Sequence, residues 1–414
     1  MKEALEQIEQ YGIEVILGRI NTWRARLLRG VLWMFSRLYG RIVALRIWLF
    51  RTRCFHDHDL GCMVISIGNL TVGGTGKTPV VEMFARALLA RGRRVVILSR
   101  GYKSQKKKVK KSGVFGTQAP VEPPRVVSDG NEVLLDSLQS GDEPYMLALN
   151  LPGVPVVVDK NRVKAGRFAL RHLGADTLLL DDGLQYIRMR RRLDVVLVDS
   201  TAPFGNEHML PRGTLREPAR NLRRASYILL TKCSGQANDK IISRIREYNR
   251  TAEIIECTHR PRYLQHIVTG ERLPLEELQG KFVGAISGIA VPEAFESGLQ
   301  RLGAIVEIND RYADHHRFDE KEVTAFLDRC LRRDLHIVVT TEKDAVRFPP
   351  LPRLDIPVYF LRIDIDILNG HEHFDACIQR ICNPPTGLRV KPARDKPSAA
   401  IVPPQISPSS ARLG

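Results

Sequence analysis

The sequence predicts an α/β fold in which a mainly parallel sheet carries helices on both faces. Short β-branched runs alternate with helical stretches from about Gly61 to Lys232, which is the pattern of strand–helix–strand units. A second, shorter series of the same kind begins near Phe282. The chain has 414 residues, of which 43% are hydrophobic and 26% charged, enough to bury the cores of two or three domains.

The expected strands are short apolar runs bounded by turn residues. In the first series they are Met63–Ile67, Val95–Leu98, Val154–Val158, Thr177–Leu180, Asp194–Val198 and Tyr227–Leu230, and in the second Val283–Ile286, Ile305–Ile308, His336–Thr340 and Pro357–Ile363. We therefore divide the chain into a basic helical segment (1–60), a core (61–278), a smaller C-terminal α/β lobe (279–382) and a Pro-rich tail (383–414) that we expect to be disordered. The Lys-rich run Lys103–Lys111 is expected to be a solvated loop.

The composition limits the cellular setting and the partners. A net charge of +17 indicates an acidic partner, which charge alone leaves open between nucleic acid, an anionic membrane face and a phosphorylated ligand. The seven Cys include no CxxC pair, which argues against a disulfide framework and favours a reducing compartment. Met1–Glu14 opens with acidic residues, so no secretory signal is expected.

The segment from Arg19 to Arg53 combines nine Arg, no acidic residue and all three Trp of the chain. It lacks the stretch of about 18 uncharged apolar residues that a simple spanning helix needs. The pattern favours an interfacial helix whose apolar side enters the acyl boundary while Arg meets lipid phosphates. The alternative is an ordinary amphipathic helix packed on the protein.

The strongest motif runs from an apolar strand through a Gly-rich turn, Gly73-Gly74-Thr75-Gly76-Lys77-Thr78, into the expected helix Val80–Ala90. Such a turn points backbone N–H groups at a phosphate, at the positive end of a helix. Lys77 is placed to bridge the terminal phosphates and the Thr78 hydroxyl to bind Mg²⁺. The motif predicts a nucleotide-binding P-loop NTPase core.

Two acidic elements are candidates for the metal. Asp181 and Asp182 end the buried strand Thr177–Leu180, where P-loop proteins hold Mg²⁺. Asp199 ends an equally strand-like run and is a rival for Asp181, and Asp182 is open to a structural role as a helix N-cap.

Gly141–Pro144 permits two interpretations. Asp142 caps a helix that Pro144 opens, or the two carboxylates of Asp142 and Glu143 divide between accepting a proton and holding the metal.

These elements belong to an ordered set of motifs that resembles one family, the tetraacyldisaccharide 4′-kinases, which phosphorylate the lipid A precursor of Gram-negative bacteria. The motifs are Ile67–Pro79, Ser99–Tyr102, Gly141–Pro144, Asp159–Arg162, Asp181–Tyr186, Phe204–Pro218, Asp314–His315 and Thr340–Arg347. Thr71 stands where the general P-loop has Gly, and this matches the loop of the family.

The resemblance implies a role for each matched residue. ATP phosphates and Mg²⁺ are bound by Thr75, Lys77 and Thr78, and Glu143, Asp181 and Asp182 complete the metal environment. Asp142 is the general base for the sugar 4′-hydroxyl, paired with His315, whose adjacent competitor is His316. The phosphate and disaccharide site is lined by Arg100, Tyr102, Arg162, Gln185, Arg216 and Glu217, although each Arg is also open to a plain surface role.

The resemblance therefore implies an ATP- and Mg²⁺-dependent kinase. Its expected acceptor is an acylated glucosamine disaccharide 1-phosphate, met at the cytoplasmic face of the inner membrane by a monomer that binds no nucleic acid. The alternatives are another P-loop enzyme, such as a metabolic kinase or GTPase, and a nucleic-acid-binding ATPase. Against a GTPase, Leu230–Ser234 lacks the Asp of a guanine-reading loop; against nucleic acid, the Arg-rich segment is also rich in Trp and Leu.

Overall fold

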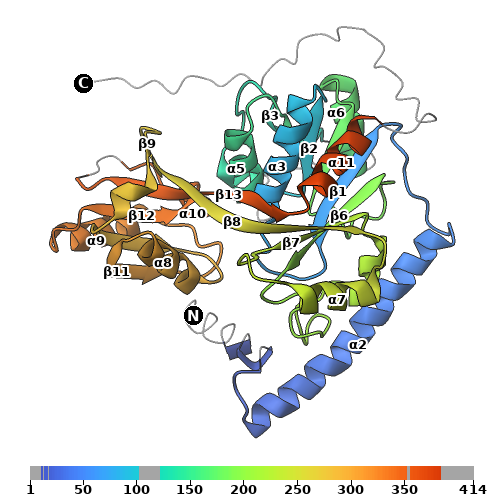
Figure 1. Ribbon diagram of the computed structural model, residues 1–414, viewed down its shortest axis with the longest axis horizontal. Coiled ribbons are helices and arrows are strands. Elements are labelled where there is room, and N and C mark those ends of the chain that lie inside the picture. The colour runs from blue at the N-terminus through green and yellow to red at the C-terminus, as the bar shows by residue number, and fades with distance from the viewer. Residues whose placement is uncertain (1–10, 13, 17, 102–121, 352–354, 384–414) are drawn as a thin grey trace, which may run out of the picture.

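The computed structural model describes residues 11–101, 122–351 and 355–383, apart from residues 13 and 17. The expectations for Lys103–Lys111 and for the tail beyond residue 383 lie outside the described residues. Within them, the strands form one continuous sheet that runs through both halves of the molecule (Figure 1). The α/β class and the mainly parallel sheet predicted from the sequence are confirmed.

The core half of the sheet contains seven strands in the described chain. In spatial order they are β3 (Arg125–Ser128), β4 (Val156–Val158), β2 (Val95–Ser99), β5 (Thr177–Asp181), β1 (Met63–Asn69), β6 (Leu193–Asp199) and β7 (Tyr227–Thr231). All neighbours except β3 and β4 are parallel. Every residue of β1 is buried, as expected for a central strand covered on both faces.

Alternation along β1 assigns helices to the two faces. Ile65 and Ile67 face the cluster that contains Phe84 and Leu88 of α3 (Lys77–Ala90), whereas Val64 faces the cluster of Ala165 in α6 (Arg162–His172). The α3 face also carries α5 (Asp142–Asn150) and α11 (His371–Cys382), and the other face carries η1 (Ala219–Arg224) and α7 (Asp239–Tyr248). Helices therefore cover both faces of the core sheet, as predicted.

Two long antiparallel strands join the core to the second half. They are β8 (Glu253–His266) and β13 (Val358–Asn369), and β8 also pairs with the short β9 (Arg272–Leu273). The sheet continues through β12 (Ile337–Thr341), β10 (Phe282–Ser287) and β11 (Ile305–Arg311). The helices of this half are η2 (Leu275–Leu278), α8 (Pro292–Arg301), α9 (Glu320–Leu331) and α10 (Glu342–Ala345), and the short α4 (Ser137–Ser140) precedes α5 in the core.

The expected strands are all present, but β3, β8 and β9 are additional to them. The sequence pattern did not predict β8, because Pro261 interrupts the strand and its exposed residues are polar. The division at residue 278 remains a prediction, since β8 and β13 both extend into each half. α11, from the predicted C-terminal lobe, returns to the core, where Phe374 packs edge-on against Phe84 with ring centroids 5.2 Å apart.

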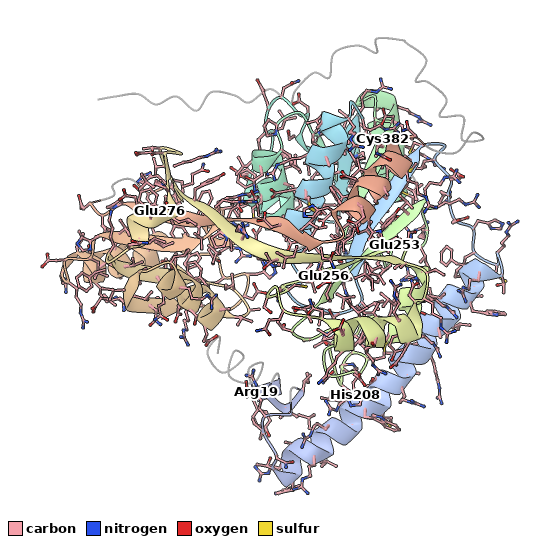
Figure 2. All side chains as sticks on the ribbon, in the orientation of Figure 1. Arg19, His208, Glu253, Glu256, Glu276 and Cys382 are labelled. Carbon is pink, nitrogen blue, oxygen red and sulfur yellow. The ribbon has the colours of Figure 1, made fainter. Side chains whose placement is uncertain are left out.

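The N-terminal helix α2 (Trp23–Arg51) is capped by Thr22 and runs along one side of the core (Figures 1 and 2). It touches the core through Tyr39, whose hydroxyl donates to the Arg216 carbonyl at 3.2 Å, and through Arg46, which donates to the Gln185 carbonyl at 3.3 Å. Many of its large apolar side chains remain exposed, namely Trp23, Leu27, Val31, Trp33, Met34, Phe35, Leu38, Ile42, Leu45 and Trp48. No helix among the described residues has the length and apolar character required to span a bilayer.

Candidate active site

The phosphate loop connects β1 to α3 in the geometry that the motif predicts. α3 begins at Lys77, three residues before the expected helix, and Pro79 falls in its first turn, where a missing N–H is tolerated. Gly76 precedes the helix with φ 76°, a left-handed conformation that favours glycine. A Cβ at Gly76 would lie 2.2 Å from Nε2 of His259, so the close approach of β8 also requires glycine here.

The loop is held from the neighbouring strand end. Thr231, the last residue of β7, donates its hydroxyl to the Thr75 carbonyl at 3.1 Å. The Thr75 hydroxyl itself is buried and has no hydrogen-bond partner among the described residues. A buried hydroxyl without a partner is costly in a folded protein unless a ligand satisfies it. The loop is therefore tied to the end of β7 and offers a polar group that a ligand can use.

Arg216 binds Asp182 beside the phosphate loop. Its Nη1 and Nη2 lie 2.8 and 2.9 Å from the two Asp182 oxygens, and its Nε donates to the Thr71 carbonyl at 3.1 Å. Lys77 Nζ lies 3.3 Å from Asn69 Oδ1 and 3.9 Å from Asp182. Burial raises the pKa of Asp182, but Arg216 and Lys77 outweigh it and the net pKa is lowered. No helix follows Asp182, so the alternative of an N-cap does not hold.

Asp181 is a fully buried carboxyl in an unfavourable electrostatic setting. Burial, Glu143 and Asp182 raise its pKa to about 7, against the Ser99 hydroxyl, which donates to it at 2.8 Å. The rival Asp199 has other partners, because Lys232 lies 2.6 Å from Oδ2 and Thr201 donates to Oδ1. Of the two candidates, Asp181 is the one beside Glu143 and Asp182.

The donor set fits a divalent cation at this place. Burial, Glu143 and Asp182 raise the pKa of Asp181, a bound cation would stabilise its ionised form, and oxygen ligands are those that Mg²⁺ prefers. Glu143, Asp181 and Asp182 supply such oxygens, and Thr78 lies in the first turn of α3. Among the described residues, no three His, Cys, Asp or Glu side chains are already arranged to hold a metal ion.

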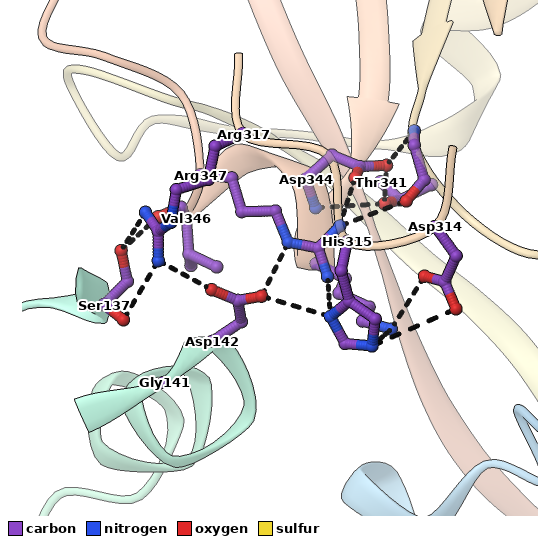
Figure 3. A network of polar contacts seen from close by, with 12 residues as sticks. Ser137, Gly141, Asp142, Asp314, His315, Arg317, Thr341, Asp344, Val346 and Arg347 are labelled. Carbon is purple, nitrogen blue, oxygen red and sulfur yellow. Dashed lines mark hydrogen bonds and ion pairs between the residues drawn. The ribbon is translucent and has the colours of Figure 1, made fainter. Parts of the chain in front are cut away.

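A second polar network surrounds Asp142 at the start of α5 (Figure 3). His315 Nδ1 lies 3.4 Å from Asp142 Oδ2, Arg347 Nε donates to the same oxygen at 2.8 Å, and Arg317 donates to Oδ1 at 3.1 Å. Burial raises the pKa of Asp142, but His315 and Arg347 outweigh it and the net pKa is lowered. Asp142 is thus an anion at neutral pH, enclosed by groups from the second half of the molecule.

The local structure also separates the alternatives left open for this network. α5 is capped by Gly141 without a side-chain bond, so Asp142 is a first-turn residue and not the cap. His316 turns away: its Nε2 lies 2.9 Å from Glu322, and its ring stacks on Tyr312. Of the two adjacent histidines, only His315 reaches Asp142. Because Glu143 follows Asp142 directly, α5 places one carboxylate in each network.

Four of the remaining predicted substrate residues lie in the part of the chain that the structure describes. Gln185 donates to the Asn69 carbonyl at 3.0 Å, and Arg162 is buried with its guanidinium 5.1 Å from the Tyr186 ring. Arg100 is exposed and contributes to the field at Arg162. Glu217 is buried and accepts hydrogen bonds from Arg224 and Asn221, so its carboxylate already has partners within the protein. Tyr102 lies outside the described residues.

The order and spacing of these groups are those of a known family. A family model described as tetraacyldisaccharide-1-P 4′-kinase matches residues 28–383. The chain belongs to this family. A tetraacyldisaccharide 4′-kinase of Syntrophus aciditrophicus is 38% identical over 344 residues, which are 81% of this chain and 88% of the relative. One from Anaeromyxobacter dehalogenans is 41% identical over 327 residues, 77% of this chain and 81% of the relative.

A solved structure of the tetraacyldisaccharide 4′-kinase family has the same fold. The "apo" form of LpxK from Aquifex aeolicus in complex with ATP is similar with a TM-score of 0.67 and 28% identity, covering 86% of this chain and all of that one. The family inferred from the motifs is confirmed. Sequence reasoning assigned no role to Asn69, His259, Arg317 or Arg347, which the structure brings to the site. Two of them had a signal, Asn69 as part of the motif Ile67–Pro79 and Arg347 as the last residue of the motif Thr340–Arg347.

Proposed function

We propose that this protein transfers the γ-phosphate of ATP to the 4′-hydroxyl of tetraacyldisaccharide 1-phosphate, a step in lipid A biosynthesis. Membership of the kinase family supports the reaction. The observation that carries the proposal is the position of α5, whose consecutive residues Asp142 and Glu143 point one carboxylate at His315 and bring the other into the field of Asp181. Asp142, the proposed proton acceptor, and the phosphate loop thereby belong to one site.

The phosphate loop is the proposed ATP site. The backbone N–H groups of Gly73, Gly74, Thr75 and Gly76 and the ammonium of Lys77 bind the phosphates, at the N-terminus of a 14-residue helix. Thr78, Glu143, Asp181 and Asp182 are the proposed Mg²⁺ environment, and Mg²⁺ when bound neutralises charge on the transferring group. In this arrangement Lys77 stabilises the charge that develops between the β- and γ-phosphates.

Asp142 is the proposed general base. Its carboxylate is ionised at neutral pH, so it can accept the proton of the 4′-hydroxyl as the oxygen attacks phosphorus. His315 comes from the second half of the molecule and lies beside this carboxylate, with Nδ1 3.4 Å from Asp142 Oδ2. The alignment of hydroxyl and phosphate by the two halves supplies the larger share of the rate, as is usual in phosphoryl transfer.

The acceptor is proposed to lie between the phosphate loop and α2. Arg100, Tyr102, Arg162, Gln185, Arg216 and Glu217 are the proposed lining, in which guanidinium groups suit the 1-phosphate of the substrate. α2 contacts the backbone of Gln185 and Arg216, so an acyl chain lying along its exposed apolar side chains would lead to these residues.

The setting that follows is a membrane surface. We propose that α2 lies in the headgroup plane of the cytoplasmic leaflet, with its Arg side chains at lipid phosphates, and that the enzyme works there as a monomer without nucleic acid. A substrate with four acyl chains remains in the bilayer, which is why the enzyme must come to it.

The deciding experiment is a reconstitution. Purified protein is incubated with labelled ATP, Mg²⁺ and tetraacyldisaccharide 1-phosphate in detergent, and the lipid is scored for a second phosphate. We expect a bisphosphorylated product and no transfer in the Lys77→Ala variant. Preference for GTP, or nucleotide hydrolysis that depends on added DNA and leaves the lipid unchanged, would instead favour the other P-loop functions.

A further inference from the structure

Residues of the motif Thr340–Arg347 hold the side chain of Arg347 in one position. The Arg347 side chain is 0% exposed, and its Nη1 donates to Asp344 Oδ1 at 3.0 Å and to the Gly288 carbonyl at 3.1 Å. Asp344 is itself buried and accepts hydrogen bonds from the Gly288 N–H at 3.0 Å and the Thr341 hydroxyl at 2.6 Å. The guanidinium therefore has one orientation, fixed by the end of β12 and the turn after β10.

The free edge of this guanidinium points at both members of the Asp142–His315 pair (Figure 3). Nε lies 2.8 Å from Asp142 Oδ2, and Nη2 lies 3.0 Å from His315 Nδ1. A guanidinium can only donate hydrogen bonds, so His315 Nδ1 is the acceptor of this contact. The imidazole then carries its proton on Nε2, the nitrogen that faces Asp314 at 4.0 Å.

Two contacts act against this assignment. The ionised Asp142 Oδ2, which can only accept a hydrogen bond, lies 3.4 Å from His315 Nδ1, and Lys343 Nζ, a donor, lies 3.5 Å from His315 Nε2. The Arg347 contact at 3.0 Å is the shortest, and Lys343 has Asp314 Oδ1 at 3.2 Å as an acceptor of its own, so Nδ1 is the nitrogen that accepts. Arg317 differs from Arg347, since its side chain is 38% exposed and binds Asp142 Oδ1 and Ser137.

We propose that Arg347 is a positioning residue that orients the Asp142 carboxylate and holds His315 in the Nε2–H tautomer. The consequence for the reaction rests on the proposed function, whereas the tautomer does not. In this role Arg347 turns the Asp142 oxygen toward the acceptor site and prevents His315 from donating through Nδ1 to that oxygen. The motif Thr340–Arg347, which the sequence left without a role, thereby acts on the reacting groups from the second half of the molecule.

The first test reads the tautomer directly in the full-length protein. The 11 histidines are labelled with ¹⁵N, and the His315 signals are assigned by their loss in a His315→Gln sample. We expect an unprotonated Nδ1 and a protonated Nε2 at pH 8 in the wild type. A protonated Nδ1 overturns the proposal. Because no variant of Arg347 is needed, this result does not depend on whether such a variant folds.

The second test uses Arg347→Met, which keeps most of the volume, and Arg347→Lys. We expect kcat to fall by about 100-fold in the Met variant with the KM for ATP changed less than threefold, because misplaced groups lose rate rather than nucleotide binding. Added methylguanidine should raise the kcat of Arg347→Met at least tenfold. Arg347→Lys should keep a kcat close to that of Arg347→Met, because Lys cannot form both contacts. A folded Arg347→Met protein with wild-type kcat overturns the proposal.

A matched control separates this role from general stability. Arg311→Met removes an arginine of the same half that binds Glu293 and Glu296 and touches neither Asp142 nor His315. Its kcat and tautomer should match the wild type, and methylguanidine should have no effect. If the wild type phosphorylates no lipid, the proposed function fails while the tautomer result stands by itself, so the two failures are distinguishable.

Discussion

Glu82 of α3 and Glu342 of α10 bind the same guanidinium, that of Arg362 in β13. Arg362 Nη1 lies 2.7 and 2.8 Å from the two Glu342 oxygens, and Nη2 contacts Glu82. Asn150 bridges the two acids from α5, at 3.0 Å from Glu82 and 2.6 Å from Glu342. Since α3 begins with Lys77 and α10 leads to Arg347, this buried ion cluster fixes the position of the phosphate loop relative to Arg347.

Removal of the shared cation should strongly destabilise the protein. The side chain of Arg362 is 4% exposed and that of Glu82 1%, so Arg362→Met removes the cation that Glu342 binds and leaves buried Glu82 with only the more exposed Arg86 as a counter-charge. Breaking a buried pair in this way costs about 3–5 kcal/mol. We expect a loss of that size in the free energy of unfolding, measured by urea denaturation. Arg244→Met, at exposed ion pairs with Glu207 and Glu247, is the control and should have little effect.

The same variant should reverse part of its defect at low pH. Burial and Glu82 raise the pKa of Glu342 even in the wild type, and Arg362 opposes them. Without Arg362 the folded-state pKa rises further above the unfolded value, so stability is largest at low pH and is lost as pH rises through the folded-state pKa. Arg362→Met should therefore lose less stability, relative to the wild type, at pH 5 than at pH 8. An equal loss at both values would rule out unpaired carboxylates as the cause.

Gly76 should tolerate no side chain, whereas Gly74 should. Ala at position 76 would occupy a left-handed conformation at φ 76° and meet the His259 ring, while a Cβ at Gly74 has nothing within 4 Å. The strain alone is worth about 1–2 kcal/mol. We expect Gly76→Ala to lower the free energy of unfolding by at least that amount and to weaken ATP binding in calorimetry. Gly74→Ala should leave the unfolding free energy unchanged.

The pKa of Asp181 predicts a proton linkage. Burial, Glu143 and Asp182 raise this pKa to about 7, so the group is about half protonated at neutral pH, and a bound cation requires its ionised form. Mg²⁺–ATP binding at pH 7 should release protons, measured as a dependence of the calorimetric heat on the ionisation enthalpy of the buffer. Asp181→Asn should abolish most of this release. The release should also shrink at pH 9, where Asp181 is already ionised.

The α2 helix should direct the enzyme to lipid. Leu38→Glu and Ile42→Glu place charge on its exposed apolar side, and each lost side chain is worth about 1.5–3 kcal/mol of burial. We expect binding to anionic vesicles to weaken at least tenfold in a sedimentation assay. The kcat in detergent should be unchanged. Val268→Glu, at an exposed apolar site of the second half, is the matched control and should bind vesicles as the wild type does.

The separation in sequence between contacting residues explains which parts of this molecule could be predicted from the sequence. The strand β1 and helix α3 depend on local pattern and on Gly76, so the phosphate loop was readable from consecutive residues. Asp142 and Arg347 are 205 positions apart and Arg362 and Glu82 are 280 apart, and no local pattern encodes such pairs. β8 was missed for a related reason, because its pairing with β13, and not its own residue pattern, makes it a strand.

Asp142 provides the sharpest test of the proposed chemistry. Asp142→Asn keeps the volume and one acceptor oxygen for Arg347 but removes the charge that would take the 4′-hydroxyl proton. We expect kcat to fall by about 100- to 10,000-fold, the usual contribution of a general base, with the KM for ATP within threefold of the wild type. Asp136→Asn is the neighbouring control: its oxygen caps α4, Asn caps equally well, and activity should be retained. A normal kcat in folded Asp142→Asn would exclude Asp142 as the general base. Charge stabilisation at the phosphate loop would then be the main source of the rate.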